Sequence, residues 1–109
     1  MQKEIWMADL NPVIGSEQSS IRPVVIISGE TMNQIYSVVI MCPLTSKVKS
    51  YKGCPVLTPD KNNNLTSLSQ VITFQVRTIS KARLIKKIGI ISDDALNDIK
   101  KGLDIFLNY

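Results

Sequence analysis

Short runs of β-branched and other apolar residues, separated by polar loops, extend along the chain as far as Ile91. Runs of this length, bounded by glycine, proline or asparagine, are typical of β-strands. The first predicted strand is Ile5 to Leu10, and the others are 23–28, 37–42, 54–58, 68–76 and 86–91. Pro43 is expected to end the strand 37–42, because proline has no N–H to donate to a sheet. Residues 29–34 are expected to form one helical turn.

The end of the chain changes to a helical period. Ser92 suits an N-cap, and Asp93 and Asp94 would lie in the first turn, where carboxylates favour the helix dipole. One apolar stripe is predicted to pack on the core as far as Tyr109, through Leu96, Ile99, Leu103 and Phe106 or Leu107. Five or six short strands followed by one helix predict a mainly β fold, a small, strongly bent β-barrel capped by the C-terminal helix.

The length of the chain and of its apolar runs restricts the class of protein. A chain of 109 residues can bury one core, so we expect a single domain over residues 1–109. The longest apolar runs, such as 23–27 and 38–42, are far shorter than a bilayer span. Residues 1–10 lack the apolar core of a signal peptide. We therefore expect a cytoplasmic protein with no membrane partner.

The cysteine and histidine content excludes much familiar chemistry. Cys42 and Cys54 are too far apart for a C-x-x-C metal or redox motif, and Cys42 ends an apolar run, which favours a buried free thiol. The chain has no histidine, so it has no Ser–His or Cys–His nucleophile and no zinc site that uses histidine. We expect neither a metal nor another cofactor. A hydrolase on this chain must use Arg, Lys, Thr, Ser, Tyr, Asp or Glu.

The distribution of charge says more than the net charge of +4. Residues 45–90 contain nine lysines and arginines but only one carboxylate, Asp60, whereas the remainder of the chain is acidic. This asymmetry indicates a polyanionic partner, with nucleic acid favoured over membrane because no basic amphipathic helix lies in this region. The alternative interpretation is that the lysines keep the edges of a sheet soluble.

The segment GSEQSSIRPVVIIS, residues 15–28, carries the clearest chemical signal. A small polar loop leads to Arg22, then Pro23, then an unbroken β-branched run. Pro23 biases Arg22 away from the helical region, so the sequence places a permanent cation at the mouth of a rigid strand. That arrangement suits an anion site better than a core.

Two further clusters follow strands. Thr45 and Ser46 come directly before Lys47, where their hydroxyls could bind phosphate, and residues 75–78 read Gln-Val-Arg-Thr. Each cluster has a plain structural alternative: a polar loop, a turn or a surface ion pair.

Taken together, these segments resemble the MazF/PemK family of toxin–antitoxin endoribonucleases. The resemblance rests on IWMADLNPVIGSEQ at 5–18, RPVVIIS at 22–28, PLTS at 43–46 and QVRTISKARL at 75–84. It implies a barrel similar to SH3-like and CcdB-like folds, usually a homodimer. It also implies metal-independent cleavage of single-stranded RNA to 2′,3′-cyclic phosphate and 5′-hydroxyl ends. The implied protein partner is a cognate antitoxin, which we expect to present an acidic, partly disordered segment.

The resemblance also assigns roles to residues. The family's catalytic pair corresponds to Arg22 and Thr45, and its loop glutamate corresponds to Glu17. Since arginine is effectively always protonated, we expect Arg22 to stabilise negative charge and Glu17 or water to accept the 2′ proton. The expected RNA-binding residues are Gln18, Ser19, Ser46, Lys47, Lys49, Tyr51, Gln75, Arg77 and Thr78.

The chain departs from the family pattern at several positions. Phe74 replaces the usual acidic residue before Q-x-R-T, where it either packs or stacks on a base, and Tyr51 could also stack on a base. The loop 47–53 and the asparagine-rich turn 61–64 match no family pattern. Two alternatives keep the fold: a gyrase poison similar to CcdB, and an RNA-binding barrel without catalysis.

Overall fold

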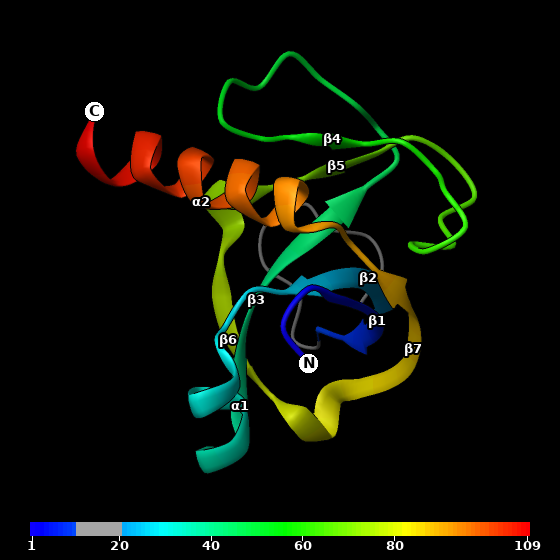
Figure 1. The fold of residues 1–109 in the computed structure, drawn as a ribbon, viewed down its shortest axis with the longest axis vertical. Helices are drawn as coiled ribbons and strands as arrows, with labels where there is room; N and C mark the ends of the chain where they lie inside the picture. The colour runs from blue at the N-terminus through cyan, green and yellow to red at the C-terminus, as the bar shows by residue number, and fades with distance from the viewer. Residues whose placement is uncertain (11–20) are drawn as a thin grey trace.

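The computed structural model describes residues 1–10 and 21–109, and within them seven antiparallel strands form one curled sheet (Figure 1). The strands are β1 Glu4–Asp9, β2 Ile21–Ile26, β3 Val38–Thr45, β4 Val56–Leu57, β5 Ser69–Val71, β6 Arg77–Ser80 and β7 Leu84–Ile90. The helices are α1 Glu30–Ile35 and α2 Asp93–Asn108, and the two short 3₁₀ turns are η1 Thr73–Gln75 and η2 Lys81–Arg83. The prediction of a mainly β, strongly bent sheet with a C-terminal helix is confirmed.

β3 is the strand around which the sheet is organised. The main path runs β4-β5-β3-β2-β1-β7, and β6 pairs with β3 outside this path. The first half of β3, from Val38 to Met41, pairs with β6, whereas Leu44 and Thr45 pair with β5. The other edge of β3 pairs with β2. A strand that changes partners along its length forces the sheet to bend, which gives the curl seen in Figure 1.

The prediction that Pro43 ends this strand is wrong, because β3 continues to Thr45. Pro43 lies where β3 passes from its pairing with β6 to its pairing with β5, so its missing N–H interrupts neither ladder. Its carbonyl still accepts a hydrogen bond from the N–H of Ile72 at 2.9 Å. Thr45 is therefore the last residue of a central strand rather than the first residue of a loop.

Two other predicted strands differ from the observed ones. The segment 68–76 divides into β5 and the turn η1, and the segment 54–58 contributes only the two residues of β4. β6 was not predicted as a strand, because its sequence, Arg-Thr-Ile-Ser, has one buried apolar residue, Ile79. It is extended because β3 pairs with it.

Apolar side chains are buried on both faces of the sheet. Val25 and Leu44 belong to a cluster that α2 covers with Leu96 and Ile99. Successive residues of β2 point to opposite faces of the sheet, so Val24, next to Val25, belongs to a second cluster. That cluster comprises Ala8, Leu10, Val24, Ile26, Val39, Met41 and Ile79. Burial on both faces explains why the central strands read as continuous apolar runs.

The prediction of a buried free thiol at Cys42 is confirmed, and Cys54 is also buried and unbridged. Burial, and to a lesser extent the nearby Cys54 thiol, together raise the pKa of the Cys42 thiol to about 12. A thiol with such a high pKa stays protonated at neutral pH and behaves as a small apolar side chain.

α2 begins as predicted but its last turn does not join the core. The Ser92 hydroxyl accepts a hydrogen bond from the N–H of Ala95 at 3.1 Å, which confirms the N-cap. Phe106 is 42% exposed and Leu107 is 77% exposed, so the expected core stripe ends near Leu103. Figure 1 shows this end of α2 extending beyond the sheet. No helix among the described residues is long and apolar enough to cross a membrane.

Candidate functional site

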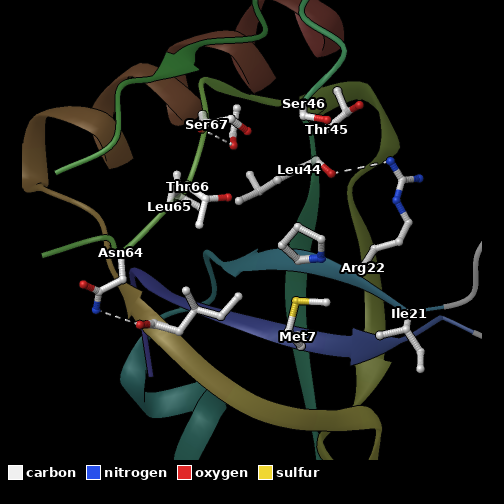
Figure 2. Close-up of a pocket in the computed structure, with 13 residues that line it drawn as sticks. Met7, Ile21, Arg22, Leu44, Thr45, Ser46, Asn64, Leu65, Thr66 and Ser67 are labelled. Atoms are coloured by element: carbon white, nitrogen blue, oxygen red, sulfur yellow. Dashed lines mark hydrogen bonds between the residues drawn. The ribbon is translucent and has the colours of Figure 1, made fainter. Parts of the chain in front are cut away.

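A pocket of about 510 Å³ opens where the start of β2 and the end of β3 face the segment 64–67 (Figure 2). Arg22, Thr45 and Ser46 form one side of it. The remaining lining residues are Met7, Ile21, Pro23, Leu44, Asn64, Leu65, Thr66, Ser67, Ser69 and Ile88. The pocket therefore draws on residues that are far apart in the sequence.

The sheet register brings Arg22 and Thr45 together. Val24 pairs with Pro43 and Val25 with Cys42 in the antiparallel β2–β3 ladder. Continuing this register by two residues places Arg22 opposite Thr45 at the rim of the sheet. The two residues to which the family resemblance assigns catalysis thus line the same pocket.

Pro23 leaves a carbonyl available to Arg22. The N–H of Ile27 donates to the carbonyl of Ile40. Because every second residue of an antiparallel strand donates to the same partner strand, residue 23 would be expected to donate to the carbonyl of Leu44. Proline has no N–H, and Nη2 of Arg22 donates to the Leu44 carbonyl instead, at 3.5 Å. The Arg22 side chain thus takes the place of the missing backbone N–H of residue 23. This contact directs the guanidinium along the rim of the sheet towards Thr45.

Thr45 is held by the turn that follows it. Its hydroxyl accepts a hydrogen bond from the N–H of Lys47 at 3.1 Å. Buried Gln70 of β5 holds the next part of the loop, because its amide exchanges two hydrogen bonds of 2.9 Å with the backbone of Lys49. The same amide donates to the carbonyl of Cys54 at 3.0 Å. Lys47 and Lys49 are exposed on this loop and do not line the pocket.

The Gln70 contacts were missed by sequence reasoning. The available signal was a glutamine amid the apolar residues of a predicted strand, since a buried amide requires several partners.

The aromatic residues form a group of their own. Tyr51 and Phe74 meet edge to face with ring centroids 5.4 Å apart, and Phe74 meets Phe106 in the same way at 5.6 Å. Of the two roles considered for Phe74, packing is observed, although its side chain is still 46% exposed. Neither Tyr51 nor Phe74 lines the pocket.

The Q-x-R-T segment lies away from the Arg22–Thr45 pair. Gln75 belongs to η1, and Arg77 and Thr78 belong to β6, where they pair with Met41 and Ile40. β6 borders the first half of β3, whereas Thr45 ends the second half, so none of the three residues lines the pocket. The predicted site residues Glu17, Gln18 and Ser19 lie outside the described residues.

Part of the basic excess in residues 45–90 has structural partners. Lys87 Nζ lies 3.1 Å from a Glu4 carboxylate oxygen, and Arg83 Nη1 donates to the carbonyl of Asp9 at 3.2 Å. Lys81 Nζ donates to the carbonyl of Asn33. In residues 1–10 and 21–109, no group of three or more cysteine or acidic side chains is close enough to hold a metal ion.

Comparison with known proteins identifies relatives of this fold. The structure is similar to a crystal structure of MazF from Deinococcus radiodurans, with a TM-score of 0.82, 22% sequence identity, and coverage of 99% of this chain and 96% of that one. It is also similar to an endoribonuclease in complex with its cognate antitoxin from a mycobacterial species, with a TM-score of 0.80 and 20% identity. That match covers 98% of this chain and 93% of the other. The fold is therefore that of the MazF class of small curled β-sheet toxins.

Sequence comparison defines the family. The model of the PemK-like, MazF-like toxins of type II toxin–antitoxin systems matches residues 1–107. The chain is 35% identical over 105 residues to a protein named endoribonuclease MazF from Staphylococcus saprophyticus, covering 95% of this chain and 88% of that relative. The chain belongs to the PemK-like, MazF-like toxin family, as its motifs predicted.

Proposed function

We propose that this protein is the toxin of a type II toxin–antitoxin system. We propose further that it is an endoribonuclease that cleaves single-stranded RNA, with Arg22 and Thr45 as its catalytic residues. The observation that carries the assignment is the shared pocket, in which the register of β2 and β3 places these two side chains at one rim. A relative with 35% identity is named an endoribonuclease, which favours this activity over the gyrase-poison and non-catalytic alternatives.

The proposed reaction uses the 2′-OH of the RNA as its nucleophile. The 2′ oxygen attacks the adjacent phosphorus, the bond to the 5′ oxygen breaks, and the products are a 2′,3′-cyclic phosphate and a 5′-OH. The protein must hold these groups in line and stabilise the added negative charge. The guanidinium of Arg22 offers a planar fork of N–H donors for the non-bridging oxygens, and the Thr45 hydroxyl can donate to the phosphate or to the leaving 5′ oxygen.

Two protons must move in this reaction. Glu17 or water takes the 2′ proton, because a guanidinium that remains protonated cannot serve as the base. The leaving 5′ oxygen takes up a proton from water as its bond to phosphorus breaks. This division leaves Arg22 to stabilise charge throughout the reaction.

Incubation of the protein with a long single-stranded RNA in EDTA tests the function. The wild type is expected to cut at defined positions, and Arg22→Ala is expected to lose at least about a hundredfold in kcat, the usual loss when an oxyanion donor is removed. Glu17→Gln is expected to lower the rate and to change its pH profile; an unchanged profile would assign the proton to water.

The controls distinguish the alternatives. Lys100→Ala, a charge deletion on the exposed side of α2, is expected to cut as the wild type does. Binding of RNA with no cuts would support the non-catalytic alternative, and trapping of a gyrase–DNA complex would support the gyrase-poison alternative.

The proposed partners follow from the same family membership. A cognate antitoxin with an acidic segment would compete with RNA for the pocket and for the basic loop after Thr45. One of the similar solved structures contains an endoribonuclease with its cognate antitoxin. We further propose that the toxin acts in the cytoplasm as a homodimer, which light scattering of the purified protein would test.

A further inference from the structure

The pocket is larger than a phosphate needs. Its volume of about 510 Å³ lies within the range of roughly 300–1,000 Å³ that is typical of sites for small organic ligands. Arg22 is the only cation among the described residues that line it, and it lies on the same side as Thr45. The opposite side is therefore free to bind something other than phosphate.

That opposite side, the wall 64–67, is uncharged. It consists of Asn64, Leu65, Thr66 and Ser67, and it faces Arg22 across the pocket in Figure 2. Thr66 and Ser67 are exposed, and a hydroxyl can both donate and accept a hydrogen bond. Leu65, Met7 and Ile88 add apolar surface to the pocket. Apolar surface beside neutral hydroxyls suits a nucleobase, which has an apolar face and a polar edge.

The asparagine-rich turn holds this wall in place. Asn63 is only 3% exposed, and its side-chain oxygen accepts from the N–H groups of Asp60 and Leu65, both at 3.0 Å. Its amide donates to the carbonyl of Thr58 at 2.9 Å. Asn64 adopts a positive φ of 54°, a conformation that asparagine tolerates better than most residues do.

The turn is also fastened to β7. The amide of Asn64 donates to the carbonyl of Ile88 at 2.9 Å, and the carbonyl of Asn62 accepts from the N–H of Ile90 at 3.0 Å. A Cβ on Gly89 would lie 2.5 Å from the carbonyl oxygens of Asn62 and Asn63, so this close approach requires glycine. A wall held at so many points is preorganised for binding.

From this geometry we propose that the wall 64–67 is a nucleoside-binding subsite that sets which base is accepted beside the scissile phosphate. The phosphate lies at Arg22 and Thr45, the base lies against Leu65 and Met7, and the hydroxyls of Thr66 and Ser67 bind its polar edge. This inference rests on the proposed endoribonuclease function.

A panel of short single-stranded RNAs tests the subsite. Each RNA carries the site that the wild-type protein cuts, mapped by sequencing the cut ends. The RNAs differ from one another only in the two bases that flank the cut. The measured quantity is the ratio of kcat/KM between the best and the worst base. In the double variant T66V/S67A this ratio is expected to fall about tenfold, equivalent to about 1.4 kcal/mol. Thr66→Ser with Ser67 retained is expected to keep the wild-type ratio.

A matched double variant provides the control. T31A/S37A removes two exposed hydroxyls near α1, outside the pocket, and is expected to keep the wild-type ratio. Active T66V/S67A protein with an unchanged ratio would overturn the subsite while the endoribonuclease function stands. Wild-type protein that makes no cuts in the long RNA from which the site is to be mapped would instead overturn the proposed function.

Discussion

At the residue scale, Pro23 helps to position Arg22 by leaving the Leu44 carbonyl without a backbone donor. Its usual consequence in a sheet is a lost ladder hydrogen bond, which is why proline is rare in central strands. Here the acceptor left by that loss, the Leu44 carbonyl, binds the guanidinium of Arg22 at 3.5 Å. The Arg-Pro pair therefore works as a unit in which the proline makes room for the contact that positions the arginine.

Replacing Pro23 with alanine tests this role. The new N–H of Pro23→Ala would compete with Arg22 for the Leu44 carbonyl, so the guanidinium would lose a partner and shift. We expect kcat for RNA cleavage to fall about tenfold with little change in KM, because the contact matters most when charge develops on the phosphate. Steady-state kinetics measures both constants.

The matched control is Pro43→Ala, since Pro43 is also within the sheet but does not line the pocket. Its kcat is expected to stay within about twofold of the wild-type value wherever the variant remains folded. Equal kcat values for the wild type and Pro23→Ala would show that Pro23 does not position Arg22.

At the element scale, α2 and the loop after Thr45 pack through two glycines. A Cβ on Gly102 would collide with the carbonyl oxygen of Gly53, so the helix and the loop approach as closely as backbone allows. Gly53 has a φ of 87°, which a side chain would strain. Its carbonyl also accepts from the buried hydroxyl of Thr73 at 2.7 Å. The loop that carries Lys47 and Lys49 is thereby attached to both α2 and η1.

The variant Gly102→Ala is expected to destabilise the protein despite the greater helix propensity of alanine. Alanine gains about 1 kcal/mol inside a helix, but the collision with Gly53 forces the loop or α2 to move, and overpacking of this kind commonly costs about 1–3 kcal/mol. We expect a net loss in the free energy of unfolding, measured by urea denaturation with Trp6 fluorescence.

Gly29→Ala is the control, because no atom outside Gly29 and its two chain neighbours lies within 4 Å of a Cβ added there. Its free energy of unfolding is expected to change by less than about 0.5 kcal/mol. A Gly102→Ala protein as stable as the wild type would show that the loop adjusts without loss.

At the scale of the whole molecule, an ion pair links β1 and β7, which are the first and last strands along the chain and neighbours in the sheet. Glu4 of β1 lies 3.1 Å from Lys87 Nζ of β7 and accepts a hydrogen bond of 3.0 Å from Trp6 Nε1. Burial raises the pKa of the Glu4 carboxyl, but the hydrogen bonds from Trp6 and Lys87, together with the positive charges of the N-terminus and Lys87, outweigh burial and bring the pKa below its ordinary 4.5. The charged carboxylate is thus more stable in the folded state than in the unfolded chain.

The lowered pKa determines how Glu4 affects stability across pH. Its contribution is present above about pH 4.5 and is lost as the pH falls through the folded-state pKa, where the carboxylate takes up a proton. We expect Glu4→Gln to be less stable than the wild type at pH 7, and the difference to shrink at about pH 3. Urea denaturation at both pH values measures it.

The variant Lys87→Met tests the other partner, since it removes the same ion pair from β7. Its loss of stability relative to the wild type is also expected to shrink as the pH falls from 7 to about 3. A Glu4→Gln deficit that is equal at both pH values would show that the carboxylate charge does not stabilise the fold.

The amino-acid sequence alone predicted the features that depend on local chemistry. The β-branched runs, the N-cap at Ser92 and the cation before Pro23 follow from the preferences of neighbouring residues. The four segments that resemble the family, at 5–18, 22–28, 43–46 and 75–84, predicted the family and with it the Arg22–Thr45 pair. Cys42 could be assigned to the core because it ends an apolar run.

Tertiary structure alone decided what surrounds that pair. Strand pairing carries β3 past Pro43, makes β6 a strand and leaves Gln75, Arg77 and Thr78 outside the pocket. The opposite wall comes from an asparagine turn whose position depends on hydrogen bonds to β7 and on a close approach at Gly89. These contacts join residues that are distant in the chain. Local preference therefore cannot predict them, because each depends on which strands lie side by side once the sheet has curled.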